Sequence, residues 1–264
     1  MSLGDIRPTV RRRISRISTY VVFALIVIVL ALVGDWPAIA KNFFNFGVAG
    51  KMWPRILRAA FNTIWYTLFA FVIGLALAVV LALMKMSKGP FKVFAVVYIE
   101  FFRGIPALLT IMLMAFAVPI AFTAAKPMAG LPGGLVALVL VTSAYTAEIV
   151  RAGIEAVPKG QREAARSLGM PHMQTTVSVI LPQAFRIVIP PLTNEFVTLL
   201  KDTSLLFIAG ATVFSKELTL FGRDGATTNG NSTPYIVVAV AYLIITIPLT
   251  YLVSRLEKKM AVKK

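Results

Sequence analysis

Six long apolar stretches constrain what this chain can fold into. A helix needs about 20 mostly apolar residues to cross the hydrocarbon core of a bilayer. Backbone groups inside lipid must find their hydrogen-bond partners within the protein, so stretches of this kind are expected to be helices. The pattern predicts an all-α integral membrane protein with about six transmembrane helices. The candidate spans are residues 17–33, 61–84, 93–122, 133–150, 185–214 and 235–253.

The composition supports a membrane protein and excludes several other classes. The 264 residues are 58% hydrophobic, which is more than an ordinary soluble domain contains. A formal net charge of +16 would suggest a nucleic-acid partner in a soluble protein. Here the basic residues flank the apolar spans without an aromatic stacking surface, so we expect no nucleic-acid binding. The chain has no cysteine, which excludes disulfides, cysteine metal ligands and a cysteine nucleophile, and we expect no metal site.

The basic residues also predict the orientation of the spans. Cytoplasmic loops of membrane proteins carry an excess of Lys and Arg. In a six-span chain, four basic groups fall on one side of the membrane, which places both termini in the cytoplasm. The first apolar stretch is followed by Gly34-Asp35-Trp36-Pro37 rather than by a cleavage site, so we expect it to be retained as an anchor. The four groups are Arg7, Arg11, Arg12, Arg13 and Arg16; Lys85, Lys88 and Lys92; Arg151, Lys159, Arg162, Arg166 and Arg186; and Arg255, Lys258, Lys259, Lys263 and Lys264.

Two segments on the outer side need a separate interpretation. Lys51, Arg55 and Arg58 lie close to the second span on the side that the charge bias disfavours. An amphipathic helix over residues 52–60, lying on the outer surface, would accommodate them. Residues 220–234 are rich in glycine and asparagine, which predicts a mobile, turn-rich outer loop.

A short polar segment between the fourth and fifth spans is the most distinctive part of the cytoplasmic side. Residues 161–168 contain strong helix formers, and Gly169 suits a left-handed C-terminal cap. Pro171 fits the first turn of a second short helix, which we expect Pro182 to close. The small Ala164–Ala165 pair would allow another protein to approach closely. On physical grounds alone, an ordinary interfacial loop explains this segment equally well.

Motif spacing separates these two interpretations. Glu163-Ala164-Ala165 is followed after three residues by Gly169 and, after nine more, by Val179-Ile180-Leu181-Pro182. This spacing resembles the EAA loop of permease subunits of ATP-binding-cassette (ABC) importers, with Val179 in place of isoleucine. The resemblance covers roughly residues 62–257. Four further segments resemble the polar amino acid branch of that family: residues 100–106, 144–154, 158–161 and 200–205.

The resemblance implies a fold and a set of partners. The family has a five-helix type I importer core, to which this chain adds one N-terminal span. The EAA loop would dock on a separate ATPase subunit through Glu163, Ala164, Ala165, Leu168 and Gly169. No Gly-x4-Gly-Lys-Ser/Thr loop occurs in the chain, so it should not be an enzyme, and ATP and Mg should bind in the partner. The other implied partners are a second permease subunit (the same or a homologous chain), an extracytoplasmic solute-binding protein, the amino acid substrate and membrane lipid.

These inferences divide the chain and place it in the bacterial cytoplasmic (inner) membrane as a multi-pass protein. Residues 61–256 would form the permease domain, with a cytoplasmic coupling loop over 155–182. The preceding parts are a basic N-terminus (1–16), the extra helix (17–34) and an extracytoplasmic segment (35–60). Residues 257–264 form a basic cytoplasmic tail.

Ionisable residues inside the spans suggest the substrate path. Glu195, Thr198 and Asp202 share one helical face, Lys201 lies on an adjoining stripe, and Thr203 and Ser204 extend the polar patch. Such residues usually face a bundle interior or a cavity. A purely structural pairing of Lys201 and Asp202 across helices is the alternative. Pro190 and Pro191 fit either a hinge or a static kink.

Two further pairs lie nearer the ends of spans. Glu100 and Arg103 have the i, i+3 spacing of an intrahelical ion pair, which a charged substrate could compete for or which could be structural. Glu148 and Arg151 have the same spacing nearer the cytoplasm, and we interpret them as structural or as stabilising a gate.

The predicted function is therefore the membrane-spanning subunit of an ATP-driven amino acid importer. Because the ion pairs leave the path near neutral, we favour an acidic or amide amino acid, with a basic amino acid as the alternative. A secondary transporter driven through Glu195, Lys201 and Asp202 would not need the EAA loop. A channel or scaffold would show no saturable uptake, and the motif spacing argues against both.

Overall fold

The computed structural model describes residues 8–53 and 55–261, with side chains described for residues 17–53 and 55–258. Every regular element in these ranges is helical. The basic residue Arg7 and the last residues of the tail, including Lys263 and Lys264, lie outside the described part, as does Pro54. The helices are α1 Pro8–Val33, α2 Trp36–Phe43, α3 Phe46–Met52, α4 Arg55–Met86, α5 Pro90–Gly104, α6 Ala107–Met112, α7 Val118–Ala121, α8 Leu131–Glu155, α9 Lys159–Ser167, α10 His172–Thr175, α11 Leu181–Asp202, α12 Leu218–Asn229 and α13 Thr233–Ala261.

The chain divides into two compact units, residues 1–46 and 47–264. In the first unit, α1 exposes every side chain from Ile17 to Val33, as expected for a helix that packs mainly against lipid. Gly34 ends this helix, and the Asp35 carboxylate caps α2 by accepting a hydrogen bond from the Ala38 amide at 3.0 Å. The unit is thus an apolar helix followed by a short capped one.

The second unit contains the membrane-spanning core. Four helical segments are long and apolar enough to cross a bilayer singly: Arg55–Met86, Leu131–Glu155, His172–Ala209 and Thr233–Lys258. Counting two bent helix pairs as spans raises the number to six, which agrees with the predicted class. The helical, multi-span fold is therefore confirmed.

Helices α4 and α8 pack closely at the centre of this unit. Small side chains form their interface, including Ala70, Ala78, Ala144 and Ala147, all fully buried. A Cβ at Gly74 would lie only 3.2 Å from Thr142, so glycine is needed for this approach. Transmembrane helices associate through such small residues because lipid provides no hydrophobic drive between them.

The predicted continuous span over residues 93–122 is wrong. Helix α5 ends at Gly104, and the chain turns by 104° before α6 begins at Ala107. Ile105 has an extended backbone, with φ −97° and ψ 135°. Proline disfavours the helical conformation of the residue before it, so Pro106 explains the break.

The segment predicted to be cytoplasmic also differs from its prediction at one proline. Pro182 does not close a helix: α10, a π-helical turn over Thr176–Ile180 and α11 follow one another without interruption. The π turn ends as α11 begins, and Pro182 occupies the first turn of α11, where a missing N–H is tolerated. The Gln183 side chain donates to the Val179 carbonyl at 2.9 Å and satisfies an acceptor beside the proline.

Two predictions for the outer side are also wrong. Residues 52–60 do not form a separate surface helix, because α3 ends at Met52 and Arg55 already begins the long helix α4. Residues 220–234 are mostly helix α12 rather than a mobile loop. Gly222 and Gly225 allow α12 to lie against α13, since a Cβ at Gly222 would come within 2.8 Å of Val238.

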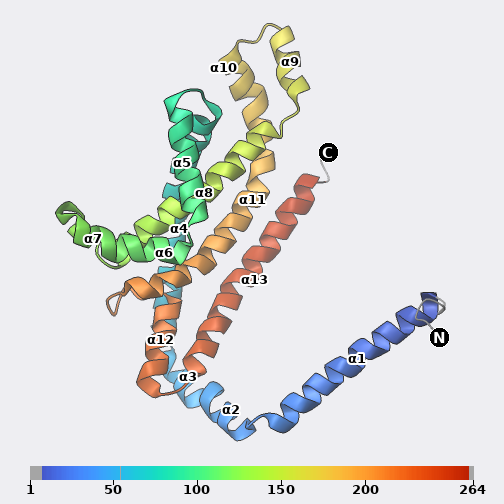
Figure 1. Cartoon of the computed structure of the whole chain (residues 1–264), viewed down its shortest axis with the longest axis vertical. Coiled ribbons are helices and arrows are strands. Elements are labelled where there is room, and N and C mark those ends of the chain that lie inside the picture. The colour runs from blue at the N-terminus through green and yellow to red at the C-terminus, as the bar shows by residue number, and fades with distance from the viewer. Residues whose placement is uncertain (1–7, 54, 262–264) are drawn as a thin grey trace. The chain divides into compact units, whose positions relative to one another are not determined.

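The second unit has two distinct ends (Figure 1). Helices α9 and α10 project at one end, and the C-terminal part of α13 runs toward it. Helix α12 and the start of α4 lie at the opposite end. Basic residues of α9 and of the last turns of α13 therefore lie toward one end, as the charge pattern predicts for a common side.

Candidate functional site

Helix α9 carries the Glu-Ala-Ala motif and ends in a well-formed cap. Gly169 adopts φ +82°, the left-handed conformation predicted for it. Its amide donates to the Arg166 carbonyl at 3.0 Å, and the Met170 amide donates to the Ala165 carbonyl at 3.2 Å. These two bonds define a Schellman motif, which satisfies the last carbonyls of the helix and fixes the direction of the chain after it.

The two alanines of the motif have different environments. Ala164 is exposed with Glu163, whereas Ala165 is only 5% exposed and packs within the chain. Of the predicted docking pair, Ala164 is therefore exposed and Ala165 is buried in the single chain. Leu168, at the C-terminal end of this polar helix, is 85% exposed. Every residue of α9 except Ala165 is exposed; we call the predicted docking residues Glu163, Ala164 and Leu168 the accessible face of α9, and Gly169 caps the helix end.

Helix α11 places the predicted pathway residues along one side. Thr198 and Lys201 are exposed in the single chain, and Glu195 and Asp202 are half-buried. The carboxylates of Glu195 and Asp202 are close enough to interact electrostatically, as expected for the i, i+7 spacing. A membrane helix cannot leave such a polar face against lipid, so this face must meet water or another protein.

The charged groups of this face lack close partners. Among the described side chains, neither Glu195, Lys201 nor Asp202 forms an ion pair within 4 Å. Thr203 differs, because it is buried and its hydroxyl donates to the Leu200 carbonyl at 2.6 Å. Ser204 is half-buried. The structure thus brings Glu195, Lys201 and Asp202 to an open face and gives Thr203 a local structural bond.

Pro190 and Pro191 both lie inside α11, which continues through them. Each proline removes one backbone N–H from the helical ladder, which weakens the helix at this point. Thr193 follows them, and its hydroxyl donates to the Ile189 carbonyl at 2.7 Å. The two prolines therefore mark a soft position about three turns before Asp202.

The predicted pair of Glu100 and Arg103 is not formed. Glu100 instead lies 3.6 Å from the Lys85 ammonium, and the Arg103 guanidinium lies over the Tyr145 ring at 5.6 Å. A cation from a neighbouring helix competes successfully with the intrahelical partner, because exposed i, i+3 pairs contribute only a few tenths of a kcal/mol. Tyr145 holds Arg103 away from Glu100.

Lys85 joins a larger ion cluster that sequence reasoning missed. Its ammonium contacts Glu148 at 2.5 Å and so ties α4 to α8. Glu148 also accepts from Arg151 at 2.8 Å, which confirms the predicted i, i+3 pair, and Arg151 continues to Glu155. The predicted apolar span ends at residue 84, so the sequence predicted a loop position for Lys85. Nothing in the sequence pairs Lys85 with Glu148, which lies 63 positions later.

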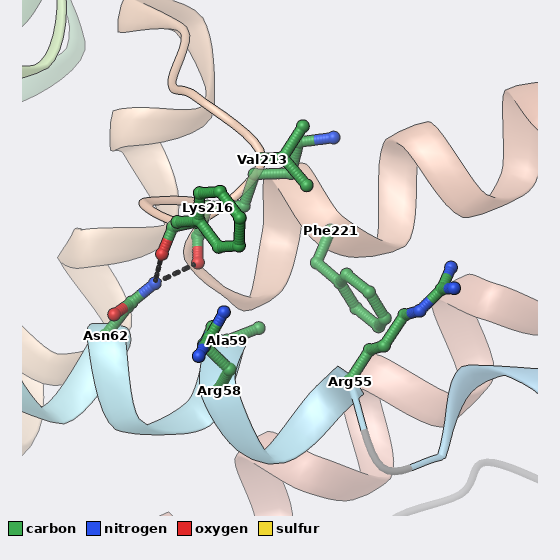
Figure 2. Close-up of a pocket in the computed structure, with 8 residues that line it drawn as sticks. Arg55, Arg58, Ala59, Asn62, Val213, Lys216 and Phe221 are labelled. Carbon is green, nitrogen blue, oxygen red and sulfur yellow. Dashed lines mark hydrogen bonds between the residues drawn. The ribbon is translucent and has the colours of Figure 1, made fainter.

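The end of the second unit formed by α12 and the start of α4 contains a second polar cluster that sequence reasoning missed. Asn62 donates to the Phe214 and Lys216 carbonyls, both at 2.9 Å (Figure 2). Tyr66 donates to the Ser215 carbonyl at 2.8 Å. Thr63 accepts from the Leu218 amide at 3.1 Å. One face of α4 therefore holds the segment before α12 in place. The sequence signal for this cluster was the i, i+1, i+4 spacing of Asn62, Thr63 and Tyr66 within an apolar run.

Glu217 completes this cluster from inside the protein. Its carboxylate caps α12 by accepting from the Thr219 and Leu220 amides, and the Tyr242 hydroxyl lies 3.3 Å away. The side chain is only 2% exposed. Burial raises its pKa from 4.5 to about 7, against the opposing effect of the hydrogen bonds. Within the described ranges, no three His, Cys, Asp or Glu side chains gather in a metal-binding group.

Residues 70–262 match the family described as binding-protein-dependent transport system inner membrane component. The chain belongs to this family. Two solved structures share the permease fold. One, described as an amino acid ABC transporter with histidines, has a TM-score of 0.72 and 34% identity, and the alignment covers 81% of this chain and 98% of that one. The MetNI methionine ABC transporter, at 22% identity and a TM-score of 0.64, supports the fold alone.

Curated relatives of the permease come from the same family. The probable glutamine ABC transporter permease protein GlnM of Bacillus subtilis is 40% identical over 201 residues, covering 74% of this chain and 90% of that protein. The arginine transport system permease protein ArtQ of Bacillus subtilis is 34% identical over 210 residues, covering 78% and 93% respectively. The L-cystine transport system permease protein TcyB of Bacillus subtilis is 39% identical over 179 residues, covering 67% and 75%.

Proposed function

We propose that this permease is the membrane-spanning subunit of an ATP-driven amino acid importer in a bacterial inner membrane. The family match and the amino acid permeases among its relatives support the class of transporter. Both termini would lie in the cytoplasm. The arrangement of basic residues supports this orientation, since α9 and the end of α13 lie toward one end of the second unit (Figure 1).

The observation that carries the proposal is the accessible face of α9. Its Schellman cap fixes a short helix at one end of the permease, and Glu163, Ala164 and Leu168 point outward from it. An exposed leucine beside an alanine is suited to a groove in another protein. In our proposal this helix docks on a separate ATPase subunit, which binds ATP and Mg.

The transport path would form between two permease subunits along the polar face of α11. That face is exposed in one chain, and a second copy or a homologous permease would cover it. An extracytoplasmic solute-binding protein would deliver the amino acid at the end formed by α12 and the start of α4. ATP shifts the equilibrium between inward-open and outward-open states only if it binds one of the corresponding ATPase arrangements more tightly.

For the substrate we propose a polar amino acid, with an amide or acidic side chain favoured. The glutamine permease among the relatives supports an amide, and Lys201 supports an acidic group. The arginine permease among the relatives favours the alternative, a basic amino acid that Glu195 and Asp202 would attract. Asp202→Asn separates them: a basic substrate should lose at least tenfold in apparent affinity, whereas an amide or acidic substrate should not weaken.

The proposed function is tested by ATPase activity in nanodiscs that contain the permease, its ATPase and its solute-binding protein. We expect stimulation by one amino acid. Ala164→Arg and Leu168→Asp should abolish stimulation and co-purification of the ATPase. Ser87→Arg adds the same side chain as Ala164→Arg at an exposed position after α4 and should have little effect. Normal coupling in Ala164→Arg and Leu168→Asp would refute docking through α9.

A further inference from the structure

A pocket of about 450 Å³ opens at the outer end of the second unit, between the first turns of α4 and the segment leading into α12. Three cationic side chains line it, namely Arg55, Arg58 and Lys216, and the two arginines rise from α4 (Figure 2). The transport mechanism proposed above gives these cations no role. Their number in one small pocket indicates an anionic ligand.

The charge of this pocket is not balanced by the described part of the chain. Lys216 forms an ion pair with Asp224. Neither arginine has a carboxylate within 4 Å among the described side chains, and Arg58 lies over the Phe214 ring at 5.2 Å. Glu217 follows Lys216 in the sequence, but its carboxylate accepts hydrogen bonds from backbone amides at the start of α12. Two positive charges therefore remain unpaired in the pocket.

The position of these charges along α4 places them at the depth of lipid headgroups. The apolar stretch of α4 begins at Phe61, so at 1.5 Å per residue Arg58 lies about 4.5 Å and Arg55 about 9 Å beyond it. The polar region on each side of the hydrocarbon core is roughly 5–8 Å thick, so the backbone of Arg58 lies within it and that of Arg55 lies at its outer edge, from which a long side chain reaches the headgroups. In the orientation proposed above, these cations lie on the side of the membrane where Lys and Arg are normally depleted. The positive-inside rule therefore does not explain their presence.

The rim of the pocket is apolar. Val213 and Phe214 are 76% and 70% exposed. Phe61 and Trp65 continue the exposed apolar surface along α4 toward the membrane core. A small soluble anion would gain nothing from this rim, and an acidic protein segment would approach from water rather than along it. An amphiphile with a charged head and apolar chains fits both parts of the site.

We propose that this pocket binds the phosphate group of an anionic phospholipid from the outer leaflet. The phosphodiester would accept hydrogen bonds from Arg55 and Arg58, because guanidinium groups match phosphate oxygens in a bidentate geometry. An acyl chain would lie along Phe214 and Phe61. The lipid would thereby cover the segment that Asn62 and Tyr66 hold against α4.

The test measures lipid preference by native mass spectrometry of the full-length permease in its transporter complex. The complex is exchanged into equal amounts of phosphatidylglycerol and phosphatidylcholine, and the retained lipids are counted. A cation near the membrane surface contributes roughly a fivefold preference for an anionic lipid, so two arginines should give roughly 25-fold. Arg55→Gln/Arg58→Gln should remove most of this preference, and Arg58→Lys, which keeps the charge but not the bidentate geometry, should retain part of it.

The matched control is Lys126→Gln/Arg223→Gln, which removes two exposed outer cations that do not line the pocket. It should keep the preference. Equal retention of both lipids by the unmodified complex, or an unchanged preference in Arg55→Gln/Arg58→Gln, would overturn the proposal. Soluble glycerol phosphate serves as the second probe: if it displaces the lipid at millimolar concentration, the site recognises a free phosphate rather than a lipid. If the double glutamine variant does not assemble, the single Arg58→Gln and Arg58→Lys variants decide by the same measurement.

Discussion

At the scale of single residues, Glu217 is the clearest example of a side chain placed against its chemical preference. A carboxyl group that is 2% exposed must either be neutral or find strong donors. Glu217 has two backbone amides as donors, yet its pKa is raised to about 7 because burial outweighs them. The phenols of Tyr66 and Tyr242 face it, and the Lys216–Asp224 ion pair lies beside it.

The raised pKa predicts that the permease loses stability as the pH rises. The unfolded carboxyl titrates near 4.5, so protonation stabilises the folded state fully below that pH. The stabilisation is lost progressively as the pH rises through about 7, by roughly 3 kcal/mol in total at 1.36 kcal/mol per pKa unit. The melting temperature of the purified permease should fall between pH 5 and pH 8.

Glu217→Gln provides the matched comparison for this effect. The amide keeps the shape and one of the two acceptor oxygens but cannot ionise, so the variant should melt at a temperature that depends much less on pH. At pH 8 it should be more stable than the unmodified permease. An equal pH slope in both proteins would show that another group causes it.

At the scale of helices, the ion cluster between α4 and α8 links two elements that otherwise meet through alanine and glycine. Lys85 and Glu148 are both half-buried. Removing one member of a buried pair typically costs about 3–5 kcal/mol. Because Glu148 keeps Arg151, we expect Lys85→Met to cost about 2–3 kcal/mol in denaturant unfolding. Lys88→Met, at an exposed position three residues later, should change stability by less than 0.5 kcal/mol.

A double variant isolates the contribution of this pair. Lys85→Met/Glu148→Gln removes both charges, so Glu148 is not left as a carboxylate without Lys85. It should lose less stability than the two single variants added together. Strict additivity would show that Lys85 and Glu148 do not stabilise each other.

The prolines of α11 give a prediction about function rather than stability. Pro190→Ala/Pro191→Ala restores two backbone N–H groups to the middle of the helix and should stiffen it. If these prolines form the hinge of a moving gate, substrate-stimulated ATPase activity should fall at least threefold while the complex still assembles. Pro248→Ala makes the same change inside α13 and should have a smaller effect. Unaltered coupling in the α11 variant would assign the prolines to a static kink.

The helices also show what the sequence could predict. The apolar length of residues 61–84, 133–150 and 235–253 is a local property, and all three lie within single helices. The cap at Gly169 was predictable for the same reason. Helix α12 was missed because Gly222 and Gly225 were interpreted as turn residues, whereas contacts with α13 decide their role. The Lys85–Glu148 pair and the burial of Ala165 depend on tertiary packing, which no local pattern contains.

At the scale of the whole molecule, the polar face of α11 makes a single permease chain incomplete. Thr198 and Lys201 would be exposed to lipid if the chain acted alone, and ionisable groups in that position are strongly disfavoured. A second permease subunit and a water-filled path between the two would remove this conflict. The proposal therefore predicts that residues of this face are accessible to water although they lie within a membrane span.

Thiol labelling tests this directly, because the chain contains no cysteine and one introduced thiol is unique. Thr198→Cys in the assembled transporter should react with a membrane-impermeant maleimide, since the reactive thiolate forms only in water. Val72→Cys, on an exposed apolar position of α4, should react at least tenfold more slowly. A non-hydrolysable ATP analogue should change the rate at Thr198→Cys, because alternating access opens the path to one side at a time. Equal labelling of both positions, or a rate at Thr198→Cys that nucleotide never alters, would mean that the α11 face is buried against protein and that the path lies elsewhere.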